Sequence, residues 1–145
     1  MATYRTVREM STEEAAYLAG LIDGEGTVTL SRREKGAQRS IVITIANTER
    51  CLLEFPLTAI GAGGISSKLT YKEGHTPSFV YQISGRQALA VLEQIAPFMH
   101  SYKKERALLA LYDYIRLTPR NGRYVTGQLE EREVFIGKFF AMKAK

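Results

Sequence analysis

The stretch Leu18-Ala-Gly-Leu-Ile-Asp-Gly-Glu-Gly26 is an apolar run that ends in two acids set between glycines. A helix C-terminus carries partial negative charge, so Asp23 and Glu25 lie where carboxylates are least stable. A divalent cation bound at this end of the helix would stabilise both of them. The ending therefore indicates a metal site, although an ordinary core helix closed by a glycine cap is the alternative reading of the run alone.

The same helix carries a stripe of very small side chains. Ala16, Gly20 and Gly24 recur every four residues and so lie on one helix face. Two helices can approach backbone to backbone along such a stripe, a device best known from membrane proteins. The spacing predicts a close helix–helix contact at this face.

The nine residues resemble the LAGLIDADG motif of homing endonucleases, with seven of the nine letters identical. Gly24 and Glu25 are the departures, and each keeps the chemical character of its position. The resemblance covers roughly residues 10–117. It implies an α+β fold with an αββαββα core and an antiparallel four-stranded sheet saddle. We expect one endonuclease domain over residues 1–145, with a C-terminal helical extension over about 118–145.

Composition is that of an ordinary globular domain. The chain has 145 residues, of which 45% are hydrophobic and 24% charged. The net charge of +5 favours a polyanionic partner, though only weakly by itself. Cys51 is the only cysteine, which excludes an internal disulfide or a cysteine-clustered zinc site.

The sequence also bears on location. It has no run of eighteen apolar residues, and its first ten residues lack an apolar signal core. We expect a soluble intracellular protein with no membrane partner and no targeting peptide, acting in a prokaryotic cytoplasm or an organelle interior.

Residue periodicity predicts nine elements. Ser11 and Glu14 form a capping-box pattern, so the first helix should run from Thr12 to about Gly24. Period-two alternation predicts strands at about 27–33, 39–47, 65–72 and 79–84. Helices are expected at about 48–60, 86–99, 101–117 and 129–142, with Pro56 bending the first of them or confining its regular part.

One face of the expected sheet is polar, and mixed hydroxyls, amides and cations suit contacts to base edges and phosphates. A two-stranded ribbon is narrow enough to enter the major groove of DNA. An ordinary solvated sheet face is the alternative. The predicted DNA-binding residues are Thr29, Ser31, Arg33, Lys35, Gln38, Ser40 and Thr44 on the first hairpin, and Ser66, Lys68, Thr70, Lys72 and Gln82 on the second.

The resemblance implies a metal site made by the Glu25 carboxylate and the Gly24 carbonyl, holding Mg²⁺, although Mn²⁺ or Ca²⁺ could occupy it. It gives Asp23 a mainly structural role. Because one acid is too few for a two-metal site and the motif occurs once, two chains must meet. The predicted interface of this homodimer comprises Ala16, Gly20, Leu21 and Asp23.

Three further residues have open interpretations. Asn47 matches the position of a family residue that orders the attacking water, but asparagine is equally common in turns. Arg50 is either a phosphate contact or a solvated charge. Lys103 resembles the family's active-site lysine and would stabilise developing charge, with a one-residue ambiguity toward Lys104.

These expectations combine into a homodimeric, metal-dependent, site-specific endonuclease acting on double-stranded DNA, with no small-molecule substrate. The resemblance implies cleavage across the minor groove, short 3′ overhangs and a long pseudo-palindromic target. Two rivals stand beside it. One is a family member that acts as an RNA maturase or a non-cleaving DNA-binding regulator; the other is an unrelated α+β module that dimerises through the glycine-striped helix.

Overall fold

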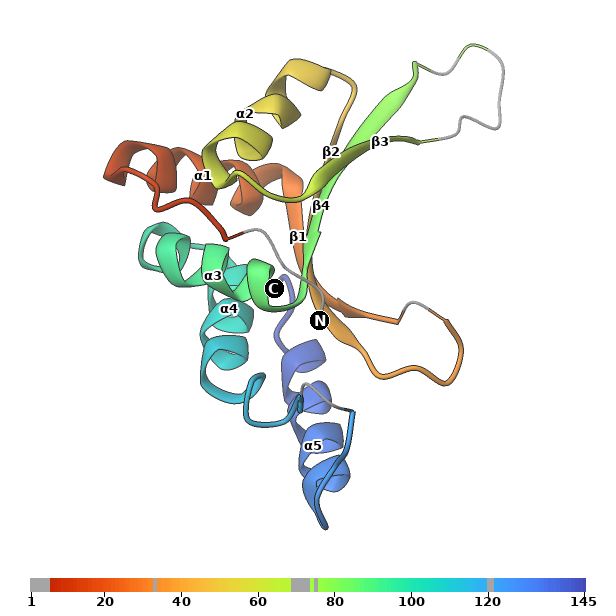
Figure 1. Cartoon of the computed structure of the whole chain (residues 1–145). Helices are drawn as coiled ribbons and strands as arrows, with labels where there is room; N and C mark the ends of the chain where they lie inside the picture. The colour runs from red at the N-terminus through yellow and green to blue at the C-terminus, as the bar shows by residue number, and fades with distance from the viewer. Residues whose placement is uncertain (1–5, 33, 69–73, 75, 120–121) are drawn as a thin grey trace.

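A computed structural model describes residues 6–32, 34–68, 74, 76–119 and 122–145. The elements follow the predicted order (Figure 1). They are α1 (Thr12–Glu25), β1 (Gly26–Ser31), β2 (Ser40–Asn47), α2 (Arg50–Ile60), β3 (Gly64–Lys68), β4 (Ser78–Ser84), α3 (Gly85–Ile95), the 3₁₀ turn η1 (Ala96–Phe98), α4 (Tyr102–Asp113) and α5 (Gln128–Ala141).

The four strands form one antiparallel sheet in the order β1-β2-β4-β3. Helices α1 to α4 contact the sheet and lie together on one of its faces, whereas the two hairpins curve away from them (Figure 1). This arrangement confirms the expected α+β fold with an antiparallel sheet covered on one side.

Strand alternation explains which face is covered. Val28 and Leu30 of β1 are buried, and they lie in register with Ile43 and Ile41 of β2, which are buried too. Leu18 and Ile22 of α1 belong to the same core. The residues between these strand positions point to the opposite face, because successive strand residues alternate.

The start of α1 agrees with prediction. The Ser11 hydroxyl accepts the Glu14 N–H at 3.1 Å, and the Glu14 carboxylate accepts the Ser11 N–H at 3.0 Å. These two bonds are the expected capping box, which satisfies amide groups that a helix start leaves unpaired.

Other boundaries shift for local reasons. The Asn47 side-chain oxygen accepts the Glu49 N–H at 2.8 Å, and this turn delays α2 to Arg50 rather than Thr48. Pro97 lies within η1, so α3 ends at Ile95 instead of Met99. Pro56 lies inside α2 and is buried.

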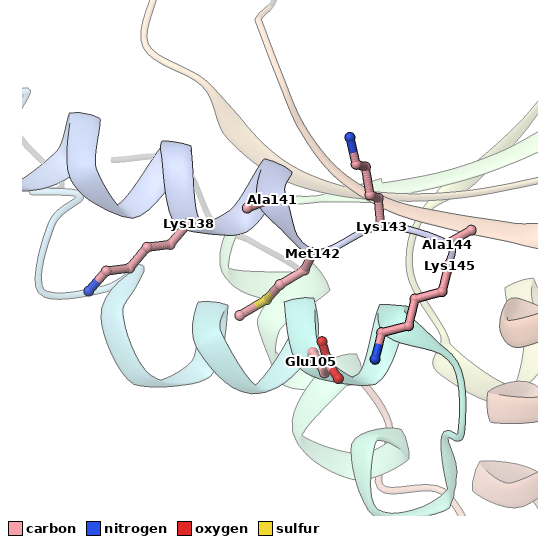
Figure 2. A pocket seen from close by; sticks show the side chains of 7 residues that line it. All are labelled: Glu105, Lys138, Ala141, Met142, Lys143, Ala144 and Lys145. Atoms are coloured by element: carbon pink, nitrogen blue, oxygen red, sulfur yellow. The ribbon is translucent and has the colours of Figure 1, made fainter.

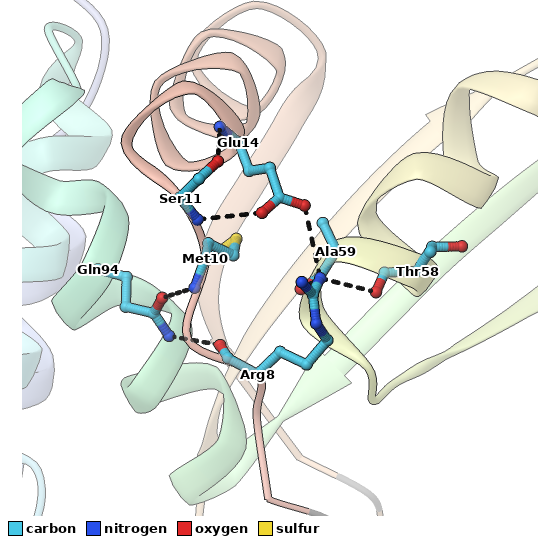
Figure 3. Close-up of polar contacts among 7 residues, drawn as sticks. All are labelled: Arg8, Met10, Ser11, Glu14, Thr58, Ala59 and Gln94. Atoms are coloured by element: carbon cyan, nitrogen blue, oxygen red, sulfur yellow. Dashed lines mark hydrogen bonds and ion pairs between the residues drawn. The ribbon is translucent and has the colours of Figure 1, made fainter.

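The segment before α1 is fastened to two helices (Figure 3). The Arg8 guanidinium donates to the carbonyls of Ala59 at 2.9 Å and Thr58 at 3.3 Å, near the C-terminal end of α2. Gln94 of α3 accepts the Met10 N–H at 2.7 Å and donates to the Arg8 carbonyl at 3.0 Å. These bonds fix the N-terminal end of α1 between α2 and α3.

No helix in the described part of the chain has the length and apolar character needed to cross a bilayer.

Candidate active site at the junction of α1 and β1

The site is built where α1 runs directly into β1. Glu25 is the last residue of the helix, its side chain is exposed, and it makes no hydrogen bond or ion pair with the described residues. Gly26 follows at a point of very close packing. A Cβ atom there would lie 2.9 Å from the Ile22 Cα and 3.1 Å from the Thr44 carbonyl oxygen. Glycine at this position therefore lets the helix end lie against β2.

Asp23 connects α1 to the start of α4. Its carboxylate accepts the N–H of His100 at 2.8 Å, the N–H of Ser101 at 3.1 Å and the Ser101 hydroxyl at 2.5 Å. Burial alone would raise the pKa of Asp23, but the bonds from Ser101 and His100 outweigh it and lower the pKa below its usual value. These contacts agree with a structural role. The predicted place of Asp23 in a dimer interface stays a prediction.

Lys103 is the lysine that reaches the end of α1. Its ammonium donates to the carbonyls of Ile22 at 3.0 Å and Asp23 at 2.9 Å, and the side chain is only 8% exposed. Desolvation lowers the pKa of Lys103, although the negative charges of Asp23 and Glu25 oppose the shift. A positive charge at these carbonyls offsets the negative end of the helix dipole beside Glu25.

Asn47 and Arg50 lie at the end of β2. The pairing of Gly26 with Ile45 brings Asn47 beside the last turn of α1. The Asn47 amide oxygen accepts the Glu49 N–H in the turn described above, so Asn47 acts as a turn residue. That Asn47 also orders the attacking water stays a prediction. Arg50 pairs with Glu54 at 3.6 Å and lies over the Phe79 ring at 5.6 Å.

Glu25 is the candidate carboxylate ligand for a cation at this site. The described residues contain no group of three or more His, Cys, Asp or Glu side chains that could hold an ion. Mg²⁺, however, keeps several waters and commonly uses one or two carboxylates together with substrate phosphates. The exposed oxygens of Glu25, next to the Gly24 carbonyl, fit that donor set when a second carboxylate and a phosphate complete it.

Polar side chains lie on the open face of the sheet, the face that α1 to α4 do not cover. Thr27 and Thr44 are paired across β1 and β2 with their hydroxyls 2.5 Å apart, and Thr44 lies opposite Gln82 of β4. Six predicted DNA-binding residues alternate with the core positions of their strands: Thr29, Ser31, Ser40, Thr44, Ser66 and Gln82. Lys35 and Gln38 lie in the connection between β1 and β2. Arg33, Thr70 and Lys72, and the side chain of Lys68, lie outside the described residues.

The small-residue stripe of α1 faces away from the core. Ala16, Gly20 and Gly24 are all exposed, and a Cβ atom added at either glycine would meet nothing within 4 Å. Tyr17 borders the stripe, 49% exposed, with its ring 4.6 Å from that of Phe55. Leu21 is half-buried and packs on the core. Packing among the described residues thus gives no reason for glycine at positions 20 and 24.

The family follows from comparison with known sequences. A family model described as a LAGLIDADG-like domain matches residues 12–96, more than half of the chain. The chain belongs to the LAGLIDADG family. No curated protein matches it.

Solved structures share the fold of this LAGLIDADG protein. The homing endonuclease I-CvuI, in complex with its target in the presence of Ca, has 20% identity and a TM-score of 0.72, over 91% of this chain and 83% of that one. The archaeal intron-encoded homing endonuclease I-Vdi141I, complexed with DNA, has 20% identity and a TM-score of 0.70, over 92% and 86%. The meganuclease I-AabMI, bound to uncleaved DNA, has 20% identity and a TM-score of 0.59, over 89% of this chain but only 43% of its own.

Proposed function

We propose that this protein is a homodimeric, metal-dependent endonuclease that cuts double-stranded DNA at specific sites. The observation that carries the proposal is the exposed carboxylate of Glu25 at the end of a helix whose neighbouring face is a bare stripe of small residues. A family whose solved members are bound to DNA supports the choice of substrate.

The dimer is proposed from α1. Association along Ala16 and Gly20 would bring the ends of two α1 helices together, so that each copy contributes one Glu25. The coverage of relatives supports this arrangement. The chain matches most of I-CvuI but less than half of I-AabMI, as expected if one chain supplies half of a site that a longer chain builds alone.

The chemistry assigns a task to each residue of the site. The Glu25 carboxylate and the Gly24 carbonyl would hold a divalent cation, proposed to be Mg²⁺. When bound, this ion supplies a Lewis acid and a more acidic water. The Lys103 ammonium holds the end of α1 through two carbonyls and has a third N–H left to face developing charge. Asp23 fixes α4, and with it Lys103, against the same helix end.

The open sheet face is proposed to read the DNA, with two copies contacting a long pseudo-palindromic target. We further propose that cleavage crosses the minor groove and leaves short 3′ overhangs. One domain over residues 1–145 would carry all of this, with its core at about 10–117. A DNA substrate places the activity in a compartment that holds DNA, either the prokaryotic cytoplasm or an organelle interior.

The test is selection of cleaved sites from a randomised DNA library in Mg²⁺, followed by the same assay with Glu25→Gln. Losing a ligand of the ion should remove several kcal/mol of transition-state stabilisation, a drop of more than roughly 100-fold in rate. Glu93→Gln removes an exposed carboxylate from α3 and should leave cleavage unchanged. A Glu25→Gln variant that still cuts would refute the metal site. Tight binding of DNA that is never cut in Mg²⁺ or Mn²⁺ would instead support the non-cleaving alternative.

A further inference from the structure

Glu25 lies in a segment, residues 22–28, that side chains of α4 bind at both ends. Before Glu25, Lys103 donates to the Ile22 carbonyl at 3.0 Å; after it, Arg106 donates to the Val28 carbonyl at 2.9 Å. Lys103 and Arg106 are three residues apart, so they project from one face of α4. No local sequence pattern predicts this second contact, because Arg106 and Val28 are 78 positions apart.

Within the described sheet, the carbonyl that Arg106 binds has no strand partner. Strand β1 lies at the edge of the sheet, so the peptide groups on its outer side have no neighbouring strand to pair with. Val28 and Leu30 are two residues apart, and their carbonyls therefore project from the same side of β1. Arg106 takes the first of them and Arg39, at 3.1 Å, takes the second.

Arg106 also joins the C-terminal segment to this edge. Its Nε donates to the Met142 carbonyl at 2.7 Å, and its guanidinium lies 4.9 Å from the ring centre of Phe139 and 5.0 Å from that of Tyr102. The segment after α5 runs along α4, where Glu105 borders an open hollow together with Met142 and other residues of the segment (Figure 2). Within the described residues Arg106 has no carboxylate partner, so its geometry is set by carbonyls and rings.

We propose that Arg106 is a positioning residue of the cleavage site: it fixes the strand end of the Glu25 segment, as Lys103 fixes the helix end, and so ties the C-terminal segment to the site. This inference rests on the proposed endonuclease function. Gly26 is tightly packed between the carbonyls that Lys103 and Arg106 bind, so the segment has little freedom to move. A displacement of Val28 would therefore displace Glu25 too. Misplacement of a reacting group by about 1 Å can cost roughly 100-fold in rate.

Arg39 provides a matched control. Its guanidinium binds the Leu30 carbonyl and lies 5.2 Å from the Phe140 ring centre, so it makes the same kinds of contact as Arg106. It does so two residues further along β1 from Glu25. Loss of either arginine leaves one edge carbonyl unpaired, but only loss of Arg106 frees the end of the segment nearest the site.

The experiment measures single-turnover cleavage of pre-bound target DNA, DNA affinity and melting temperature for Arg106→Gln, Arg106→Lys and Arg39→Gln. We expect Arg106→Gln to lower the cleavage rate by roughly 10- to 100-fold with little change in affinity. Arg106→Lys keeps the charge but not the paired donors, and its rate should lie between those of Arg106→Gln and the unsubstituted protein. Arg39→Gln should cleave at nearly the normal rate. Equal loss in Arg106→Gln and Arg39→Gln, or a normal rate in Arg106→Gln, overturns the proposal.

A second readout does not depend on cleavage. The Gly26 N–H donates to the Ile22 carbonyl at the end of α1, so its hydrogen exchange reports local opening of the Glu25 segment. Arg106→Gln and Arg106→Lys should exchange faster there than Arg39→Gln. If the unsubstituted protein cuts no DNA but this difference appears, the endonuclease proposal fails while the anchoring by Arg106 holds. Equal exchange in all variants overturns the anchoring itself.

Discussion

At the scale of single residues, the end of α1 is controlled by a contact that leaves no room for a side chain. Gly26 has φ −102°, a value open to any residue, so glycine is required here by space and not by backbone conformation. The two nearest atoms in the way belong to the backbone of Ile22 and Thr44. Backbone cannot rotate aside as a flexible side chain can.

Gly26→Ala should therefore lower the free energy of unfolding by about 1–3 kcal/mol, the usual cost of overpacking. Urea denaturation of the purified protein measures the change. Gly137→Ala is the control, because Gly137 lies in α5 with nothing within 4 Å of an added Cβ. That change should stabilise the protein by up to about 1 kcal/mol, since alanine favours helix more than glycine does. Equal effects of the two substitutions would contradict the steric account.

At the scale of elements, α1 has two faces with different tasks. Leu18 and Ile22 are buried in the core, whereas Ala16 and Gly20 are exposed, and a Cβ atom added at Gly20 would meet nothing within 4 Å. A large side chain at position 20 would leave the fold of one chain intact and block only the approach of a second helix. Because Glu25 ends the same helix, a change that prevents the proposed dimer would also remove the second Glu25 from the proposed metal site.

Gly20→Leu is expected to convert the dimer into a folded monomer and to abolish double-strand cleavage. Light scattering coupled to size exclusion measures the mass, and circular dichroism reports the fold. Gly137→Leu places the same side chain on an exposed face of α5 and should remain dimeric. The proposed interface is wrong if Gly20→Leu has the mass of the unsubstituted protein.

Elements were predictable from sequence because their signals are local. The capping box at Ser11 and the period-two alternation of β1 and β2 each lie within a few residues, and they gave the right elements in the right order. Boundaries failed where one side chain changed the path, as Asn47 does before α2. In such cases the competing turn is as compatible with the sequence as the helix is.

Contacts between distant residues were beyond the reach of pattern alone. The resemblance gave Asp23 a mainly structural role, but its hydrogen-bond partner Ser101 lies 78 positions away. The final helix lies beyond the residues that the resemblance covers. Arg132 of α5 is nevertheless only 1% exposed and donates to the Leu117 carbonyl at 2.7 Å and to the Arg39 carbonyl. Such long-range bonds depend on the assembled fold and not on local spacing.

At the scale of the whole molecule, the two sides of the sheet differ, and we expect only the uncovered side to bind DNA. The helices cover one side of the sheet (Figure 1). The other side carries the polar strand residues that alternate with the core positions, such as Thr29, Thr44 and Gln82. The net charge of +5 acts over the whole surface, whereas a phosphate contact acts at one place. Salt dependence separates these two contributions to DNA binding.

We expect the affinity for DNA to fall steeply with salt, by roughly 0.9 log unit per log unit of salt for each phosphate neutralised. Lys35 lies exposed in the connection between β1 and β2, and Lys35→Gln should reduce that slope by about one phosphate contact. Arg116→Gln removes the same charge from the helical side, where Arg116 pairs with Asp113 and Glu131. Its slope should match that of the unsubstituted protein. Fluorescence anisotropy over a salt series measures all three proteins, and equal reductions in the two variants would show that net charge, and not the sheet face, governs binding.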